Sequence, residues 1–372
     1  MKLRWICLPC AILAVFLIIS RSSRAVDQRP INEVLTKQVL TKEDLQVIDA
    51  FLSEAIQELL RTRDFTTVAQ LRAVILSKQG KQPQYVQQYS ESARRHLQAG
   101  IQKALALPED RQAKVLANLL IIIDQLQDVA MADLAIGVLG HKNMMVRYWA
   151  VHSLTNPTFV AKLKAGGEAG LRTARVVGEQ FKGLVGTSAP EVLALMAGFA
   201  GSLDLTQTND LLLQVADARI QQYNSWSVKY ELAEIAILKA LSDKIESAGS
   251  NRPALAQRFG QLLSCAVQRY IKGKDILIDT QKRQIASVLV ETEAKCLAKL
   301  LGDATSTNFR RALERDDYAG LSAEHNRLLG DANQAGQLAA RLNFNFGKDP
   351  RGRDRLSPVP LPDPPAKSAG AN

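Results

Sequence analysis

The sequence predicts an all-α protein, built as an irregular array of antiparallel helix pairs. Apolar residues recur at intervals of three and four along the body of the chain, which is the spacing of amphipathic helices, and no segment alternates strictly as a strand does. None of the thirteen prolines falls inside an expected helix of the body, where one would cost about 3 kcal/mol. Aromatic residues make up only 5% of the chain, so Leu, Ala, Val and Ile must fill the core.

The N-terminus has the pattern of an export signal. A basic start is followed by the uncharged run Trp5–Ile19 and by small residues suited to cleavage. As a helix this run would rise about 22 Å, short of the hydrocarbon core of about 30 Å. The sequence therefore predicts a signal peptide over residues 1–25 and a periplasmic or secreted protein. Arg21 and Arg24, directly after the apolar run, leave an alternative open, an uncleaved membrane anchor formed by residues 5–20.

A linker over residues 26–40 is followed by an N-terminal helical region over residues 41–128. Thr41, with Asp44 three residues later, forms a capping box that starts the first helix, and Asp64 caps the second. Two further helices follow, each beginning at a proline. The second of these is apolar around most of its circumference, as a buried helix is.

The central stretch Leu134–Pro157 is expected to form the end of one helix, a tight turn and a second helix from Asn143 to Thr155. Asn143 is a good N-cap residue, and the proline just past the end forbids continuation. Helical spacing gathers five residues into one stripe that is wide enough to be buried. These residues are Val146, Trp149, Ala150, Ser153 and Leu154.

The run Val146-Arg147-x-x-Ala150-x-x-Ser153-Leu154 resembles the second helix of a HEAT repeat, whose usual form is V-R-x-x-A-x-x-A-L. The match covers one repeat of the 372-residue chain. Ser153 stands where the family has alanine, and the acidic residue usual before the valine is absent. The resemblance implies an α-solenoid of the HEAT or armadillo kind, because one such unit cannot bury its apolar face alone. It also implies that Val146, Ala150 and Leu154 are structural, and that Arg147 bonds to a neighbouring repeat.

HEAT-like central repeats are expected over residues 129–248, and a C-terminal helical region over residues 249–342. The tail over residues 343–372 combines Arg, Asp, Pro and small residues and has almost nothing to bury. We expect it to be disordered, with its prolines extended in a polyproline manner. The expected helices after Pro157 are 168–185, 190–203, 206–223, 227–245, 254–271 and 280–301.

The mature chain keeps two cysteines, Cys265 and Cys296, on the two helices of the last long pair. A turn centred near Asp275 would place Cys296 roughly 16 Å beyond the level of Cys265. A disulfide needs Cα atoms within about 6.8 Å of each other. A turn centred near Thr280 would bring the two thiols together. Both interpretations therefore stay open, two separate buried thiols or one disulfide.

Two sets of side chains are candidates for binding a partner. The first set lies opposite the apolar stripe of the central helix, where it meets either the next helix of a stack or a partner. The second set recurs at i, i+3 and i+7 across a helix start, and is either a staple of the core or a platform for a ligand. The first set is Met144, Tyr148 and His152, and the second is Tyr223, Trp226 and Tyr230.

The sequence contains no pattern of catalytic or metal-binding residues. The four histidines lack metal-ligand spacing, and the mature chain has no C-x-x-C, no H-E-x-x-H and no calcium-loop motif. The segment around Ser188 is not a G-x-S-x-G nucleophile turn. The glycine-rich segment Gly166–Gly170 lacks the strand and the lysine of a phosphate-binding loop. We therefore expect no enzyme, no catalytic residue, no metal and no cofactor.

The sequence favours an exported, non-enzymatic helical scaffold that mediates protein–protein interaction in the cell envelope, an inference from fold analogy. The alternative is a binder of anionic polymers or of a membrane surface. The formal charge is +10, but the leader holds four Lys or Arg and no acid, so +6 remains on the mature chain. No Lys/Arg cluster is longer than a pair, so specific nucleic-acid binding is not expected. The membrane would otherwise be reached only through an uncleaved N-terminal segment.

Overall fold

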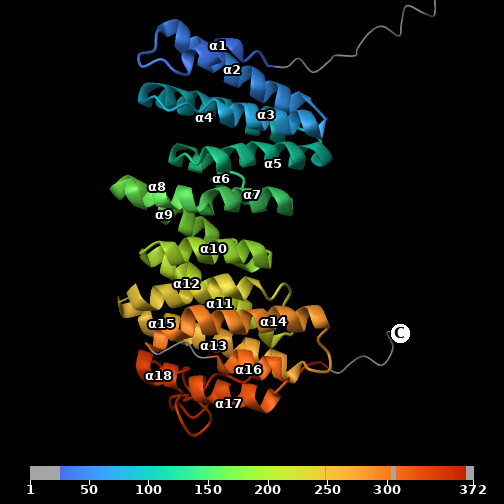
Figure 1. Cartoon of the computed structure of the whole chain (residues 1–372), viewed down its shortest axis with the longest axis vertical. Coiled ribbons are helices and arrows are strands. Elements are labelled where there is room, and N and C mark those ends of the chain that lie inside the picture. Colours follow the sequence, from blue (N-terminus) through green and yellow to red (C-terminus); the bar gives the residue numbers. More distant parts are fainter. Residues whose placement is uncertain (1–25, 248, 303–306, 366–372) are drawn as a thin grey trace, which may run out of the picture. The chain divides into compact units, whose positions relative to one another are not determined.

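The computed structural model describes residues 26–247, 249–302 and 307–365. Within them every regular element is a helix, and extended pairing is limited to two isolated β-bridges (Figure 1). The prediction of an all-α protein is therefore confirmed. None of the helices in this described part is both long and apolar enough to cross a membrane. Residues 1–25, expected to be a signal peptide or an anchor, lie outside it.

The helices form two compact units, which divide within α5 (Glu109–Leu126), between residues 122 and 123. In the first unit, α2 packs against α1, α3 and α4. The helices of this unit that precede α5 are α1 (Arg29–Val34), α2 (Lys42–Arg61), α3 (Phe65–Ser77) and α4 (Pro83–Leu105).

Both caps that the sequence predicts in the first unit are confirmed. Thr41 and Asp44 form a reciprocal capping box at the start of α2. The Asp64 side chain accepts a hydrogen bond from the backbone N–H of Thr67 at the start of α3. Bonds of this kind satisfy N–H groups that a helix leaves without intrahelical partners, so they fix where a helix begins.

The second unit contains the end of α5 and all later helices. Its α-helices are α6 (Ala132–Ile136), α7 (Met144–Thr155), α8 (Pro157–Ala165), α9 (Gly167–Lys182), α10 (Pro190–Ser202), α11 (Thr206–Asn224), α12 (Ala233–Ser247), α13 (Arg252–Lys272), α14 (Asp279–Thr292), α15 (Ala298–Leu301), α16 (Asn308–Glu314), α17 (Tyr318–Leu329) and α18 (Gln337–Leu342). Short 3-10 turns are η1 (Val129–Met131), η2 (Val185–Thr187) and η3 (Gly249–Asn251), and η4 (Glu293–Leu297) is a π-helical turn between α14 and α15.

Two rows of helices make up most of the second unit. In one row α7 packs on α10, α10 on α12, and α12 on α14 and η4. In the other row α9 packs on α11, α11 on α13, and α13 on α17. The rows are joined because α10 packs on α11 and α12 on α13. Small residues allow the close approach of α10 and α12, since a Cβ added to Gly201 would lie 2.8 Å from the Cβ of Ala240.

Pro157 has a second role that the sequence prediction lacks. It follows the end of α7, as expected, but it also begins α8. Proline fits the first turn of a helix because the N–H group that it lacks would have no partner there. The structure therefore contains a helix over residues that the sequence prediction leaves as a short connecting segment.

The start of α12 also differs from the prediction of a helix from residue 227. Trp226 and Tyr230 have φ angles of 55° and 53°, which lie outside the range of a right-handed helix. Residues 225–232 therefore form a connecting loop, which we call the α11–α12 loop, and α12 begins at Ala233. The aromatic residues predicted to follow one another on a helix lie instead at the end of α11 and on this loop.

The prediction of a disordered tail is wrong for residues 343–365, which pack against α13 within the second unit. Phe346 is buried, and Leu361 is only 1% exposed. A Cβ added to Gly260 of α13 would lie 3.0 Å from the Phe346 ring, so the helix surface is shaped for this contact. Composition misled the prediction because this segment is anchored by a few well-placed apolar side chains and by hydrogen bonds from residues distant in sequence, such as Gln261 and Gln268. Residues 366–372 lie outside the described residues.

Candidate functional site

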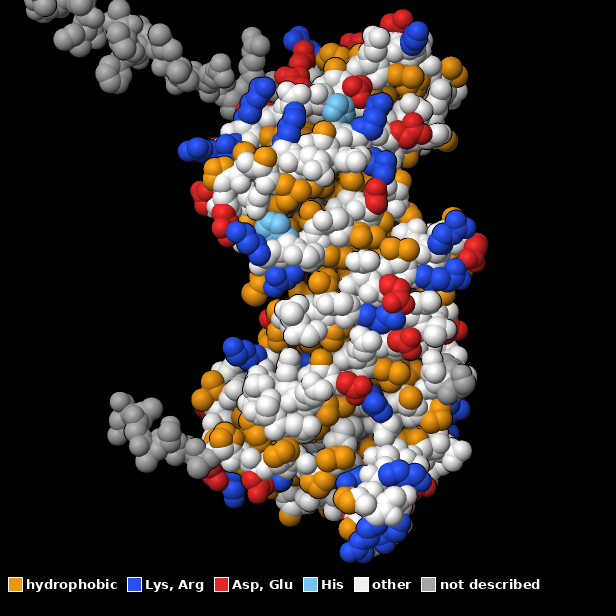
Figure 2. Space-filling model, turned by 180° about the vertical axis from the view of Figure 1, so that it is seen from behind, with side chains coloured by type: hydrophobic (Ala, Val, Ile, Leu, Met, Phe, Trp, Pro, Cys, Tyr) orange, Lys and Arg blue, Asp and Glu red, His pale blue; other side chains and the backbone are white. Residues whose placement is uncertain are grey.

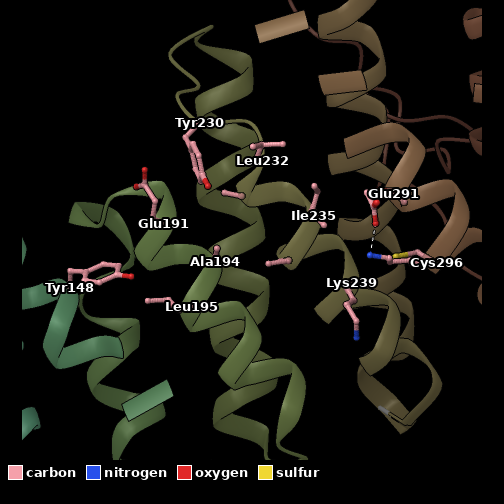
Figure 3. Close-up of a pocket in the computed structure, with 14 residues that line it drawn as sticks. Tyr148, Glu191, Ala194, Leu195, Tyr230, Leu232, Ile235, Lys239, Glu291 and Cys296 are labelled. Carbon is pink, nitrogen blue, oxygen red and sulfur yellow. Dashed lines mark ion pairs between the residues drawn. The ribbon is translucent and has the colours of Figure 1, made fainter. Parts of the chain in front are cut away.

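A groove crosses α7, α10, α12 and η4 in the second unit. It consists of two hollows of about 560 Å³ and about 450 Å³ that share Tyr148 and Glu191. In the larger hollow, Tyr148 and Glu191 lie at one end, and Glu291 and Cys296 lie at the other (Figure 3). We call this feature the apolar groove.

The groove is open where its lining side chains are small, and larger apolar side chains form the rest of its lining. Alanine reaches no further than Cβ, so a backbone or side chain of a ligand can come close to α10 and α12 at these positions. The lining residues of this kind are Ala194, Ala233 and Ala236, and their larger apolar neighbours are Leu195, Leu232 and Ile235.

Large hydrophobic side chains at the groove are exposed to solvent. Met144 is 64% exposed, Met145 41% and Tyr230 42%. The Tyr148 ring packs edge-on against Trp149, with ring centroids 5.6 Å apart, so its position is set by its own helix. Single exposed apolar residues are ordinary, but several along one groove are typical of a binding surface.

Charged side chains at the groove are of both signs, and most are paired. Lys239 contacts Asp243 at 2.5 Å, and Lys295 contacts Glu291 at 2.5 Å, each across one helical turn. Glu191 is exposed at the boundary of the two hollows. On the face drawn in Figure 2, Lys and Arg also alternate with Asp and Glu, except where basic residues gather at its lower end. The lining of the groove itself contains three basic and two acidic residues, so its charge is mixed.

Two buried arginines hold the α11–α12 loop, which brings Tyr230 and Leu232 to the groove. Arg219 of α11 donates to the Lys229 carbonyl at 3.3 Å and 3.4 Å. Arg269 of α13 donates to the Val228 carbonyl at 3.5 Å, and its guanidinium lies 5.3 Å from the Trp226 ring centroid. Buried hydrogen bonds and a cation–π contact thus replace helical hydrogen bonding in the loop.

Each of these arginines pairs with a buried glutamate beside the groove lining. Arg219 bonds both carboxylate oxygens of Glu234, with Nη2 2.6 Å from Oε1, and both side chains are fully buried. Arg269 contacts Glu231 at 3.0 Å. Burial raises the pKa of Glu234 to about 7, while Arg219 acts to lower it. Neither pair was predicted from the sequence. A charged residue on an otherwise apolar helix face is a signal that could have indicated a buried ion pair.

The structure brings together three of the six residues predicted to bind a partner. Met144, Tyr148 and Tyr230 all line the apolar groove. His152 lies outside it, with Nδ1 3.0 Å from Oδ1 of the buried Asp124. Tyr223 and Trp226 do not line it either. Tyr223 is fully buried, and the Trp226 ring N–H donates to the Pro362 carbonyl at 3.0 Å.

The stripe of the central helix is buried, apart from Trp149. Val146 and Ala150 are 0% exposed, and Ser153 and Leu154 are also buried, whereas Trp149 is half-buried. Arg147 departs from the role that the resemblance implies. It donates to the carbonyls of His141 and Lys142, in the turn before its own helix. The guanidinium thus closes that turn, and these two bonds do not reach a neighbouring helix pair.

Cys265 and Cys296 are two separate, buried free thiols in the structure. The disulfide, the other interpretation left open by the sequence, is therefore absent between them. Burial raises the pKa of Cys265 to about 12 and that of Cys296 to about 11. Cys296 lies on the π-helical turn η4 and lines the groove, but a thiol with so high a pKa is a poor nucleophile at neutral pH.

Three side chains lie at the distances of a hydrolase triad, but the serine among them is not accessible to a substrate. Ser264 Oγ lies 2.8 Å from His325 Nε2, and His325 Nδ1 lies 3.0 Å from Asn326 Oδ1. Ser264 is fully buried in the middle of α13, so a substrate cannot reach its oxygen. Nucleophilic catalysis needs the reacting atom beside the substrate, and we assign the three residues a structural role.

Within the described part of the chain, no three His, Cys, Asp or Glu side chains converge in a way that could hold a metal ion. No protein-family model matches the sequence, and the search of curated proteins finds no relative.

Proposed function

We propose that this protein is an exported, non-enzymatic helical scaffold of the cell envelope, and that its apolar groove binds an amphipathic helix of a partner protein. The observation that carries the proposal is the groove itself, two adjoining apolar hollows that share Tyr148 and Glu191. Exposed Met144 and Met145 line the smaller hollow, and exposed Tyr230 lines the larger. Concave apolar surfaces of this size commonly receive the apolar face of a helix. Export rests on the pattern of the first 25 residues.

The helix packing supports a HEAT-like interpretation of the second unit. Its two rows, with α7, α10 and α12 in one and α9, α11 and α13 in the other, have the layered organisation of a solenoid of helix pairs. A solenoid presents one row of helices as a long binding surface, and the groove crosses one such row.

The charges favour a protein helix as the occupant rather than an anionic polymer. Three basic residues line the groove. Lys239 and Lys295 are each paired with a carboxylate, and Arg147 donates to two backbone carbonyls. A polyanion would need unpaired basic residues in a row. An amphipathic helix would seat its apolar side chains in the hollow and meet the rim of mixed charge with its polar flanks.

The test is a binding measurement with a library of helical peptides that carry apolar residues at i, i+3, i+4 and i+7. The peptides are titrated against the parent protein and two variants. Ala194→Arg places a long charged side chain in the groove, and Val176→Arg places the same side chain on exposed Val176 of α9, away from it. We expect a subset of peptides to bind the parent and the Val176→Arg variant equally, and the Ala194→Arg variant at least about tenfold more weakly.

Salt separates the proposal from the alternative. Affinity for a groove-bound helix should change little between low and moderate salt, whereas binding to heparin or anionic vesicles should fall steeply. If Ala194→Arg leaves peptide affinity unchanged, the groove is not the site at which the peptides bind. Steeply salt-dependent heparin binding with no peptide binding would favour the anionic polymer.

A further inference from the structure

The C-terminal segment Pro358–Asp363 lies extended along α13 in the second unit. Gln261 makes two hydrogen bonds to the backbone of Val359, accepting from its N–H at 2.8 Å and donating to its carbonyl at 2.9 Å. Gln268 accepts from the N–H of Leu361 at 2.8 Å. Side chains of the helix therefore hold the segment by its main chain.

Further contacts complete this site at the C-terminal end of α13. Lys272 donates to the Leu361 carbonyl at 2.6 Å and forms an ion pair with Asp363 at 2.8 Å. The ring N–H of Trp226 donates to the Pro362 carbonyl at 3.0 Å. The Leu361 side chain is buried.

The helix residues that make these contacts lie on one face of α13. Gln261, Gln268 and Lys272 are separated by seven and four residues, which is helical spacing. Gln268 is itself held in place, because its amide donates to Ser264 Oγ at 2.8 Å. We call this face, together with Trp226, the α13 site.

The sequence of the bound segment explains why it fits. Prolines at every second position, from Pro358 to Pro364, favour an extended chain and remove alternate N–H groups. The N–H groups of Val359 and Leu361 remain, and they donate the hydrogen bonds that Gln261 and Gln268 accept. The pattern of donors in the segment thus matches the pattern of acceptors on the helix.

We propose that the α13 site is a peptide-binding site for extended segments that have proline at every second position and a Leu-Pro-Asp sequence at the centre. The chain's own segment occupies the site in the structure and so competes with such a segment of a partner protein. The proposal does not rest on the apolar groove, because none of the residues that make these contacts lines it. Extended proline-rich ligands need little ordering on binding, which favours their recognition by a rigid surface.

The test uses the full chain with its own segment displaced by substitution. Leu361→Asp would bury a charge, so the segment should leave the site. A fluorescent peptide of residues 357–365 is then titrated by anisotropy against the parent and the variant. A tethered segment has an effective concentration on the order of millimolar, so a peptide that binds the variant at about 10 µM should appear roughly 100-fold weaker with the parent.

Control variants test whether the peptide uses the contacts seen in the structure. In the Leu361→Asp background, Gln268→Ala removes an acceptor of the site, and we expect at least a tenfold loss of peptide affinity. Lys274→Met removes an exposed basic residue two positions past Lys272 and should leave the affinity unchanged. Val359→Pro is a second way to weaken the binding of the chain's own segment to the site. It removes the N–H that donates a hydrogen bond to Gln261, and it alters no buried side chain.

The outcomes are distinct. Circular dichroism first establishes that each variant keeps the helical content of the parent. The proposal is overturned if the folded Leu361→Asp and Val359→Pro variants both fail to bind the peptide at 100 times the expected dissociation constant. It is also overturned if Gln268→Ala leaves the binding unchanged, since the peptide would then lie elsewhere.

Discussion

At the scale of single residues, the second unit is organised around buried charges that the sequence analysis did not find. Arg219 and Glu234 are both fully buried, and Arg219 also holds the α11–α12 loop through the Lys229 carbonyl. Exchanging such a pair for apolar residues often costs little, whereas removing one partner leaves an unpaired buried charge. The pair therefore serves to define the position of the loop more than to add stability.

A double-mutant cycle tests this interpretation. Glu234→Gln should lower the free energy of unfolding by about 3–5 kcal/mol, because the Arg219 charge loses its partner. Arg219→Met alone should be similarly costly, and the double variant should be less destabilised than the sum of the two. Urea unfolding followed by circular dichroism gives the values. As a control, Asp243→Asn breaks the more exposed pairs with Lys239 and Lys299 and should cost no more than about 1 kcal/mol for each pair.

The cysteines give a prediction about pH. Burial disfavours the thiolate and raises the pKa of Cys296 to about 11 and that of Cys265 to about 12. Because only the thiolate reacts, alkylation by iodoacetamide at pH 8 should be slow in the folded protein and should increase only as the pH approaches these values. In urea both residues should react rapidly. Mass spectrometry of the labelled peptides locates the reaction, and fast labelling of folded Cys296 at pH 8 would contradict the buried assignment.

At the scale of elements, the sequence predicted where a helix begins when the capping hydrogen bond joins residues that are close in sequence. The caps at Thr41, Asp64 and Asn143 are all present, because each is made by residues two or three positions apart. The start of α12 could not be predicted in this way. It depends on Arg269, which is distant in sequence and holds the loop at the Val228 carbonyl. The order of the C-terminal segment likewise depends on Gln261 and Gln268, nearly a hundred residues earlier.

The candidate site was only partly predictable for the same reason. Met144 and Tyr148 share a helix, so their common face follows from spacing alone. Tyr230 joins them because the α11–α12 loop carries it there, a fact of tertiary packing that no local pattern contains. The sequence indicated that these side chains were candidates, but it did not indicate that they line one groove.

The central helix offers the sharpest test at this scale. Val146 of α7 is 0% exposed, and Met144 on the same helix is 64% exposed. Val146→Asp would bury a charge without a partner and should lower the free energy of unfolding by more than about 3 kcal/mol. Met144→Asp, the matched control, should change it by no more than about 0.5 kcal/mol. If the two variants melt alike, α7 does not bury the face assigned to it.

At the scale of the whole molecule, the chain is divided into two units that each have a core. Leu97 of α4 is fully buried in the first, and Leu263 of α13 is fully buried in the second. Chains with more than one compact unit commonly depart from a single cooperative unfolding transition.

This division predicts the response to core substitutions. Leu97→Ala and Leu263→Ala should each cost about 2–5 kcal/mol, and each should affect only the unit that contains it. Hydrogen exchange measured by mass spectrometry across a urea series would resolve the units. We expect Leu97→Ala to increase exchange in residues before 122 and Leu263→Ala in residues after it. Equal effects of both variants throughout the chain would indicate a single cooperative structure.

The α11–α12 loop has a consequence for communication between surfaces. Trp226 touches the C-terminal segment and Tyr230 lines the groove, four positions away on the same clamped stretch. A ligand that shifts this stretch at one surface alters the geometry offered at the other, and thermodynamic reciprocity requires the effect to be equal in both directions. Leu361→Asp, which frees the terminal segment, should therefore change the affinity of the groove for its helix by some factor. Binding of that helix should change the affinity of the α13 site for the proline peptide by the same factor.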